Sequence, residues 1–457
     1  MPSSFREIAT KGDFYSGKKE TDMFFQKDIE TMSRQEIEEL QLKKLKHQVQ
    51  YCMDNVPFYH KRLTEAGVTA DKIKCLSDVQ YIPYTTKADI RDNYPYGLFA
   101  VPMKQIDRIH ASSGTTGKPT VVGYTRHDID IWSDTVARFC AAVGVNDNDV
   151  AQISFGYGLF TGALGLHYGL EKLGCAVVPI SSGNTKKQAM ILKDFGTTVL
   201  ISTPSYAMYM SEVAHECGIS NDDLKLRVGL FGSEGCTDAL RDKIEKGFGL
   251  FSTDNYGMSE LQGPGVSGEC EFRCGLHFAE DHFLPEIINS ETGEVLPRGE
   301  KGELVITTLS KEGIPLLRYR TKDITRIHYE KCKCGRTHAR MEKVQGRSDD
   351  MLKIRGVNVF PSQIESVMAN IDGISPHYEL ILTRKNYTDY LEVRIEINDE
   401  KLLENFADLE RKQKEAVDKL KTVLGIQAKV TLVAPRTIAR YEGKAKRIID
   451  KRGEAEA

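Results

Sequence analysis

The sequence predicts an α/β protein with a large N-terminal domain of layered sheets and helices and a small α+β domain at the C-terminus. A chain of 457 residues is too long for one ordinary hydrophobic core, so at least two domains are expected. From about residue 105 to residue 310, short β-branched runs alternate with helical stretches, and the pattern changes near Gly346. We therefore expect one domain over residues 1–346 and another over residues 347–457.

The first predicted element is a scaffold helix that begins after Ser33. Ser33 and Glu36 have the spacing of a capping box, in which each side chain bonds the backbone N–H of the other residue. Apolar residues then recur on one side of the following run: Ile37, Leu40, Leu45 and Val49. This pattern is typical of an amphipathic helix that packs against a core.

The middle of the chain predicts a sheet whose faces are covered by helices. Its β-branched runs include Thr198–Ser202, Arg227–Phe231 and Glu303–Thr307. In α/β cores of this kind, ligand-binding loops gather at the ends of the strands.

One uncharged segment, Val150–Leu170, is about long enough to cross a bilayer. It contains five glycines and the polar residues Gln152, Ser154 and His167. We therefore expect a buried strand over Val150–Phe155, a glycine-rich turn and a packed helix in place of a membrane span.

Beyond Gly346 the sequence predicts a compact α+β unit of about a hundred residues. Its expected helices are Pro361–Asn370 and about Asp399–Val423. Its expected strands are Glu379–Thr383, Leu391–Ile397 and Ala428–Val433. The small polar run Gly346–Asp350 has the composition of a hinge.

The composition argues against several classes of protein. A net charge of −3 offers no electrostatic basis for binding nucleic acid or an anionic membrane surface. The first residues lack the apolar core of a signal peptide, so the ten cysteines indicate a reducing compartment. We expect a cytoplasmic protein with neither a nucleic acid nor a membrane as partner.

The most informative motif is a loop rich in Ser, Thr and Gly. It comprises Ser112, Ser113, Gly114, Thr115, Thr116, Gly117 and Lys118. Glycine lets successive backbone amides turn toward one anion, and the hydroxyls add donors, so the loop can wrap a polyphosphate. It is not a Walker A loop, because only Thr115 and Thr116 separate its glycines and Pro119 follows the lysine. An ordinary surface turn is the alternative.

Four further motifs follow in order along the chain. They are Gly232-Ser233-Glu234-Gly235, Asp254-Asn255-Tyr256-Gly257-Met258-Ser259-Glu260, Arg318-Tyr319-Arg320-Thr321-Lys322-Asp323 and Glu442-Gly443-Lys444. The first stands directly after a β-run, where a ligand-facing strand end belongs. The third ends in a carboxylate that can accept two hydrogen bonds from a diol.

In this order the motifs resemble those of the adenylate-forming superfamily of acyl-CoA synthetases, adenylation domains and luciferases. Within that superfamily the chain is most similar to the phenylacetate-CoA ligase family. Gly346–Ile364 and Glu280–Phe283 are especially close to this family, and the resemblance extends from about residue 35 to residue 452. It implies ATP, Mg²⁺ and coenzyme A as cofactors or co-substrates, and a homodimer.

The resemblance implies that a carboxylate attacks the α-phosphate of ATP and that three residues are catalytic. Thr115 and Thr116, with the loop amides, would hold the β- and γ-phosphates. Glu260 would bind Mg²⁺, a hard cation that prefers oxygen ligands. Lys444 would stabilise the charge that grows in the transition state. The three catalytic residues are then Thr115, Glu260 and Lys444.

The resemblance also implies the nucleotide and cofactor contacts. Tyr256 would stack on adenine, and Asp323 would accept hydrogen bonds from the ribose hydroxyls. The remaining residues of this set are Gly232, Ser233, Glu234, Asp254, Asn255, Gly257, Met258, Ser259, Arg347 and Lys353. Each main residue has a plainer alternative: Lys444 as a surface charge, Glu260 as a helix cap, Tyr256 as a core residue, and Asp323 as a structural ion pair.

The run Phe155–Phe160 is the predicted acyl pocket. Its two glycines leave room for a flat ring, and Tyr157 and Phe160 can pack against that ring. Gly235 completes the predicted substrate residues. We therefore expect an aryl acid, phenylacetate or a close relative, and a turn packed for stability is the alternative.

The superfamily's second step passes the acyl group from AMP to a thiol. The resemblance implies that a mobile small domain rotates about the hinge residue Asp349. This rotation would remove Lys444 and open a pantetheine channel, whose thiol side Lys353–Phe360 would line. A small domain on a short polar linker suits such motion.

Four of the ten cysteines occur as two close pairs. Cys270 and Cys274 precede His277, while Cys332 and Cys334 lie further along the chain. Zinc takes four such ligands in a tetrahedron. Some members of the resembling family carry Cys, six residues, His, then Cys-x-Cys-Gly, which implies Cys270, His277, Cys332 and Cys334, with Cys274 as substitute. The site would be structural, and a group of free thiols is the alternative.

Together these observations predict an ATP-dependent ligase of phenylacetate catabolism. It would convert a phenylacetate-like acid to its CoA thioester through an acyl-adenylate, releasing AMP and pyrophosphate. One alternative is an adenylating enzyme that passes the acyl group to a carrier protein or an amine. The others are a nucleotide sensor without catalysis and a cysteine-rich nucleic-acid module.

Replacement of Lys444 by Ala tests the assigned catalytic lysine. We expect Lys444→Ala to slow adenylation about a hundredfold or more, because it removes one charge that stabilises the transition state. Transfer to CoA from a supplied acyl-adenylate should persist. Separate assays of pyrophosphate exchange and thioester formation measure the two steps, and equal loss in both would argue against alternation of the domains.

Overall fold

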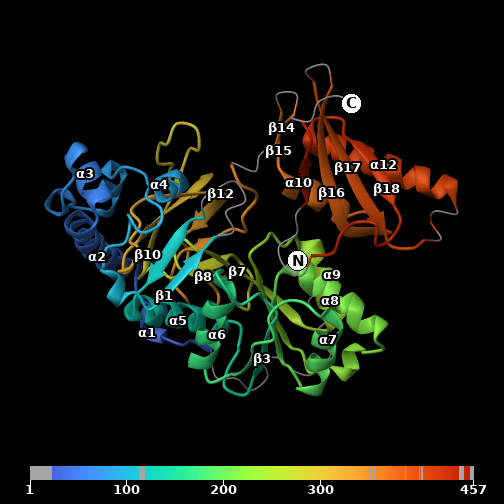
Figure 1. Ribbon diagram of the computed structural model, residues 1–457, viewed down its shortest axis with the longest axis horizontal. Helices are drawn as coiled ribbons and strands as arrows, with labels where there is room; N and C mark the ends of the chain where they lie inside the picture. The colour runs from blue at the N-terminus through green and yellow to red at the C-terminus, as the bar shows by residue number, and fades with distance from the viewer. Residues whose placement is uncertain are drawn as a thin grey trace.

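The computed structural model describes residues 23–112, 119–348, 352–354, 357–385, 388–400, 402, 405–441 and 447–452. Figure 1 shows a large unit, coloured blue to yellow, and a smaller unit in orange and red beside helices α8 and α9. Among the described residues, one main hydrophobic core extends to Met341 and a separate core begins at Leu352. The α/β class is confirmed, and the predicted boundary at residues 346 and 347 falls between these cores.

The predicted scaffold helix is confirmed as α2. Ser33 Oγ accepts the Glu36 backbone N–H at 3.2 Å, and the Glu36 carboxylate accepts the Ser33 N–H at 2.8 Å. Ile37, Leu45 and Val49 are buried, as the spacing predicts. The helices of this N-terminal region are α1 (Lys27–Glu30), α2 (Arg34–Asn55), α3 (Pro57–Glu65) and α4 (Lys87–Asp92).

An 11-stranded sheet crosses the large unit, with the spatial order β10-β11-β12-β13-β9-β8-β7-β6-β5-β3-β4. From β4 to β7 neighbouring strands are parallel, and from β7 to β10 they are antiparallel. The parallel strands are β3 (Val150–Ile153), β4 (Ala176–Val178), β5 (Val199–Ser202), β6 (Val228–Gly232) and β7 (Phe251–Met258). The others are β8 (Gly263–Glu269), β9 (Leu276–Phe278), β10 (Phe283–Ile288), β11 (Lys301–Thr308), β12 (Tyr319–His328) and β13 (Arg340–Met341).

Helices α6 to α9 lie around the parallel half of this sheet, and α5 packs against α6 and β8 (Figure 1). Strands β5 and β6 are buried at every position, which explains why their sequences are runs of mainly apolar residues. A separate antiparallel hairpin, β1 (Arg108–Ala111) and β2 (Val121–Tyr124), flanks the Ser/Thr/Gly loop. The helices are α5 (Arg126–Ala141), α6 (Gly162–Lys172), α7 (Thr185–Asp194), α8 (Pro204–Glu216) and α9 (Asp238–Phe248).

The uncharged segment Val150–Leu170 forms a strand, a turn and a helix, as predicted. The strand β3 ends at Ile153, two residues earlier than expected, and α6 follows the turn. A Cβ on Gly165 or Gly169 would lie 2.2 Å from a side-chain carbon of α5, so only glycine lets these helices approach so closely. No helix within the described part of the chain is long and apolar enough to span a membrane.

The small unit is a four-stranded sheet, in the order β18-β17-β16-β19, covered by two helices. The predicted helix from about Asp399 is interrupted: residue 402 is helical, Asn405 is not, and α12 begins at Phe406. The Asn405 side chain caps it by accepting the Asp408 N–H at 3.3 Å. The elements are β14 (Leu352–Ile354), β15 (Val357–Val359), α10 (Pro361–Ala369), β16 (Ile374–Lys385), β17 (Thr388–Ile397), α12 (Phe406–Leu424), β18 (Lys429–Val433) and β19 (Ile448–Asp450).

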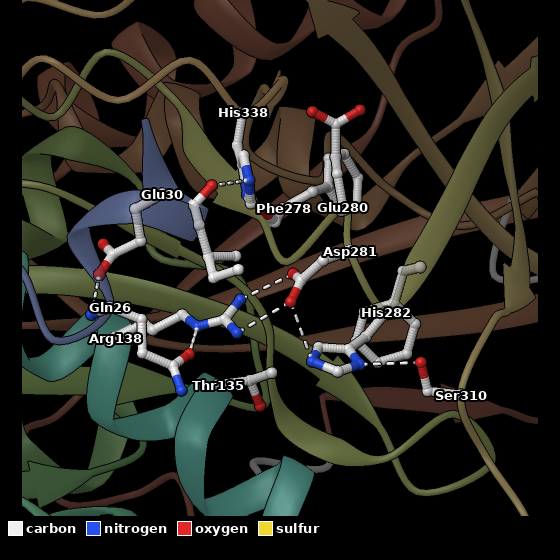
Figure 2. A network of polar contacts seen from close by, with 12 residues as sticks. Gln26, Glu30, Thr135, Arg138, Phe278, Glu280, Asp281, His282, Ser310 and His338 are labelled. Carbon is white, nitrogen blue, oxygen red and sulfur yellow. Dashed lines mark hydrogen bonds and ion pairs between the residues drawn. The ribbon is translucent and has the colours of Figure 1, made fainter. Parts of the chain in front are cut away.

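A buried ion pair joins α5 to the connection between β9 and β10 (Figure 2). Arg138 donates from two guanidinium nitrogens to the Asp281 carboxylate, at 2.7 and 2.8 Å. The same carboxylate contacts His282 Nε2 at 3.0 Å, and His282 Nδ1 lies 3.0 Å from Ser310 Oγ. Because Arg138 and Asp281 are both more than nine-tenths buried, each charge depends on the other.

Replacement of Arg138 by Leu tests the contribution of this pair to stability. Arg138→Leu should lower the free energy of unfolding by about 3 kcal/mol, because Asp281 would remain buried without its cation. The matched control is Arg126→Leu, which removes an exposed pair with Asp107 and should cost less than about 1 kcal/mol. Urea unfolding followed by circular dichroism measures both, and equal losses would contradict the assignment.

Candidate active site

The hairpin of β1 and β2 holds the base of the Ser/Thr/Gly loop closed. Ser112 N–H donates to the Thr120 carbonyl at 2.9 Å, and Thr120 N–H donates to Ser112 Oγ at 3.1 Å. The Thr120 hydroxyl donates to the same Oγ at 2.7 Å. These bonds fix the two ends of the loop, Ser112 and Thr120, side by side.

Glu260 lies against this loop base. Its side chain is buried, with the residue only 3% exposed, and Oε1 lies 3.2 Å from Thr120 Oγ1. Lys87 Nζ, from the first position of α4, approaches the same oxygen at 3.3 Å. The structure therefore brings the predicted magnesium ligand to the predicted phosphate loop, and it adds a cation from a third element.

Lys87 is a site residue that the sequence analysis missed. A cation at the first position of a helix opposes the helix dipole, which favours negative charge at that end. Thr86 caps α4 in an ordinary way, so the local sequence otherwise looks like a simple helix start. A lysine at that unfavourable position is the local feature of the sequence that could have indicated a contact with a carboxylate elsewhere in the chain.

The motifs after β6 and along β7 lie on neighbouring strands, with Gly232 opposite Asn255. A Cβ on Gly232 would lie 2.8 Å from the Asn255 carbonyl oxygen, so this close pairing requires glycine. Ser233 follows with φ of 70°, a left-handed turn that directs the chain away from the sheet. Glu234 accepts the Ser205 N–H at 2.7 Å at the start of α8.

Tyr256 of β7 and Asp323 of β12 form a second polar group. The Tyr256 hydroxyl donates to Asp323 Oδ2 at 2.6 Å, and Arg347 Nη1 donates to Oδ1 at 3.2 Å. Burial, together with the charge of Asp323, raises the pKa of the Tyr256 phenol well above its ordinary value. The phenol therefore keeps its proton and acts as a donor to the carboxylate.

The two arginines before Asp323 are paired with other carboxylates. Arg318 binds Glu286 at 2.8 Å, and Arg320 binds Glu303 at 2.7 Å. The Asp323 carboxylate therefore accepts hydrogen bonds from residues of distant segments, Tyr256 and Arg347. This arrangement favours a binding role for Asp323 over a local structural ion pair.

Several predicted site residues lie outside the described residues, and their roles stay predictions. They are Ser113, Gly114, Thr115, Thr116, Gly117, Lys118, Asp349 and Lys444. Lys353 lies on β14, but its side chain is also outside the description.

The predicted acyl-pocket residues have different environments. Tyr157 is half-buried, and its hydroxyl lies 3.1 Å from His167 Nδ1 on α6. Phe160 is 53% exposed, and Gly235 is also exposed. The assignments of Tyr157, Phe160 and Gly235 to an acyl pocket all stay predictions.

The structure brings four predicted metal ligands together. Cys270, His277, Cys332 and Cys334 are buried, and their ligand atoms all lie within 4.8 Å of one another. Cys274 is exposed, although its sulfur lies 3.4 Å from that of Cys332. The four buried residues are the set that the family resemblance implies.

The distances in this cluster suit a tetrahedral zinc ion. Zinc–sulfur bonds of about 2.3 Å give a sulfur–sulfur edge of about 3.8 Å, and a sulfur–nitrogen edge of about 3.5 Å. Cys270 and Cys332 sulfurs are 3.8 Å apart, and Cys334 Sγ is 3.5 Å from His277 Nε2. Three sulfurs and an imidazole therefore fit the ion without rearrangement of these two pairs.

Comparisons with known proteins agree with this geometry. The family model "AMP-binding enzyme" matches residues 27–310, and "AMP-binding enzyme C-terminal domain" matches residues 356–452. Phenylacetate-coenzyme A ligase of Thermus thermophilus is 45% identical over 94% of this chain and 100% of its own length. The enzymes of that name from Pseudomonas putida and Escherichia coli are 48% and 46% identical, over 93% of this chain and 96% and 97% of theirs.

Solved structures of 2-hydroxyisobutyryl-CoA ligase are also similar. The postadenylation state in complex with R3-HIB-AMP gives a TM-score of 0.88, at 28% identity over 94% of this chain and 92% of that chain. The thioesterification state, in complex with 2-HIB-AMP and CoA, gives a TM-score of 0.71. Its identity is 29%, over 95% of this chain and 94% of that chain. The whole chain therefore superposes better on the postadenylation arrangement.

Asp254, on β7, has an unusual electrostatic environment. Burial and the nearby charge of Glu269 raise the pKa of its carboxyl from 3.8 to about 7, although Arg241 and Lys343 oppose this. Because the folded-state value is the higher one, the folded protein binds this proton more tightly than the unfolded chain. Ionised Asp254 therefore reduces stability progressively as the pH rises from about 4 to about 7.

Asp254→Asn removes the ionisable group and with it this pH-dependent loss of folding stability. We expect the stability of the variant relative to the natural protein to increase by about 2 kcal/mol between pH 5 and pH 8. Urea unfolding at the two pH values measures the difference. A difference that stays constant with pH would show that Asp254 is already ionised, without penalty, at pH 5.

Proposed function

The chain belongs to the phenylacetate-CoA ligase family of AMP-forming acid–thiol ligases, and we propose that it converts an aryl carboxylic acid to its CoA thioester. One observation carries the proposal: Glu260 meets the base of the Ser/Thr/Gly loop, and Tyr256, just before it along the chain on β7, pairs with Asp323. A triphosphate and a nucleoside thus have separate polar sites in one region. A homodimer and a cytoplasmic location are also part of the proposal.

In the first step the acid is activated by ATP. A carboxylate oxygen of the acid attacks the α-phosphorus, the bond to the bridging oxygen breaks, and pyrophosphate leaves. The amides and hydroxyls of Ser112–Lys118 would hold the departing phosphates, and Lys444 would stabilise the growing charge. Mg²⁺, when bound by Glu260 and phosphate oxygens, would neutralise negative charge on the triphosphate.

The nucleoside end would be held by Tyr256 and Asp323. A carboxylate has about four acceptor sites, so Asp323 would accept ribose hydroxyls beside the hydrogen bonds from Tyr256 and Arg347. Since these two donors also restrain the carboxylate, it is oriented before the nucleotide arrives. The ring of Tyr256 would provide an apolar face for adenine.

In the second step the acyl group passes to coenzyme A. The thiol sulfur attacks the acyl carbonyl, the bond from that carbon to the AMP oxygen breaks, and the thiol proton is lost to a base or water. Rotation of the small domain about Asp349 would withdraw Lys444 before this step. The better superposition on a postadenylation structure than on a thioesterification structure supports a present conformation that precedes this rotation.

Release of AMP tests the proposed reaction. Purified protein is incubated with ATP, Mg²⁺ and a panel of aryl and aliphatic acids, with and without CoA. The proposal expects CoA-dependent AMP release with phenylacetate-like acids. Pyrophosphate exchange without CoA-dependent release would favour a carrier protein or an amine as acceptor, and an absence of both from folded, ATP-binding protein would favour a sensor.

We further propose that the cluster of Cys270, His277, Cys332 and Cys334 binds a structural zinc ion. Zinc would only cross-link these segments of the chain, because four protein ligands complete its coordination shell and leave no position for a substrate or water. The segment after Cys334 also holds the N-terminal helix: Arg336 Nε donates to Glu30 at 2.7 Å. The metal would therefore stabilise the docking of the first helices on the sheet.

Zinc content and thermal stability test this assignment. The natural protein should contain about one zinc per chain by elemental analysis, and Cys334→Ser should lose the metal and melt at a lower temperature. Cys274→Ser is the matched control, since it removes a nearby but exposed thiol, and it should retain the metal. Loss of zinc from both variants alike would mean that Cys274 is a ligand.

A further inference from the structure

The turn that carries Glu260 is held by side chains from other parts of the chain. This turn, Met258–Gln262, joins β7 to β8. The Tyr124 hydroxyl shares its proton between the carbonyl oxygens of Ser259 and Gln262, at 3.2 and 3.1 Å. Lys311 Nζ donates to the carbonyl of Leu261, the residue directly after Glu260, at 2.6 Å.

Lys311 is an unusual residue for such a position. It is 7% exposed, and its ammonium group lies 4.3 Å from the centre of the Tyr124 ring. Its charged neighbours are Asp128 and Glu260, whose carboxylates favour the protonated ammonium. Burial has the larger effect and lowers the pKa of Lys311 from 10.5 to about 8, so the side chain still carries its charge at neutral pH.

The backbone around Lys311 is itself fixed. Asp128, in the first turn of α5, accepts the N–H groups of Glu312 and Gly313 at 2.8 and 2.9 Å. Gln48 of α2 donates to the Lys311 carbonyl at 2.7 Å. Because the lysine is anchored from two helices, its ammonium group is a rigid support and not an adaptable surface charge.

We infer that Lys311 is a positioning residue for Glu260, the predicted magnesium ligand, and this inference rests on the proposed function. Lys311 fixes the peptide that follows Glu260 and places a positive charge near its carboxylate. Magnesium demands near-ideal octahedral geometry, so a small displacement of one carboxylate weakens its binding. Groups that orient a metal ligand typically change metal affinity or activity about 10- to 100-fold when removed.

The remaining supports of the Glu260 carboxylate show why its backbone must be fixed. Thr120 is a neutral hydroxyl, and the Lys87 side chain is 38% exposed. Lys87 would also compete with Mg²⁺ for Oε1, the oxygen that it contacts. Support from Lys311 acts through the main chain, and it therefore persists when the carboxylate exchanges Lys87 for the metal.

Lys44 provides a matched control within the same region. It too is a lysine, in this case partly buried, that donates to a backbone carbonyl, that of Asp281, at 2.6 Å. Burial lowers the pKa of Lys44 as it does that of Lys311. Lys44 also donates to Ser310 Oγ, beside Lys311, at 3.1 Å, but neither Asp281 nor Ser310 is a predicted magnesium ligand.

The test compares Lys311→Met with Lys44→Met. Pyrophosphate exchange is measured against free Mg²⁺ at saturating ATP and acid, and thioester formation is measured from supplied acyl-adenylate. Lys311→Met should raise the half-saturating Mg²⁺ concentration at least about fivefold and slow adenylation about tenfold, while thioester formation changes less than about twofold. Lys44→Met should leave the magnesium dependence unchanged.

Equal magnesium dependence in folded Lys311→Met and the natural protein would overturn the inference, as would an equal shift in Lys44→Met. Should Lys311→Met not fold, Tyr124→Phe removes the neighbouring support and should raise the half-saturating Mg²⁺ about threefold. Magnesium-dependent ATP binding by calorimetry gives the same comparison without turnover. Failure of the natural protein to adenylate any acid would therefore count against the proposed function alone.

Discussion

Burial of negative charge beside the central sheet is the constraint on which the rest of this site depends. Glu260 and Asp323 are 3% and 5% exposed, and a carboxylate removed from water needs compensating donors or cations. Lys87 and the Tyr256 hydroxyl are among the groups that meet this need. They come from separate elements, α4 and β7, so the polar site is complete only when the large unit has folded around it.

Polar contacts between described residues join the two units. Lys243 of α9 donates to the Ile374 carbonyl at 3.3 Å, and His377 lies 3.7 Å from the acidic side chain of Glu212. Arg347, next to the predicted hinge, contacts Asp323 in the large unit. Polar contacts of this kind can break and re-form in water at little cost, which suits a small domain that takes two positions in a two-step reaction.

Much of the fold follows from local sequence patterns. The capping box at Ser33 marks the start of α2, and the glycines of Val150–Leu170 distinguish a packed helix from a membrane span. The same reasoning misplaced the start of α12, because a charged, helix-favouring run continues across the Asn405 cap. Lys87 was missed for a different reason: its partner is distant in sequence, and one lysine in a short helix gives little signal.

The order and spacing of the motifs, read from the sequence by itself, determined the family, the nucleotide chemistry and the set of metal-ligand candidates. These properties depend on residue identity and on the backbone. At Gly232, for example, a Cβ would clash with the Asn255 carbonyl oxygen. Only the tertiary structure decided which charges meet: Lys87 and Lys311 at the Glu260 turn, and Arg347 at Asp323. Such contacts join segments far apart in the chain, and their energies arise from burial and distance, which no local pattern encodes.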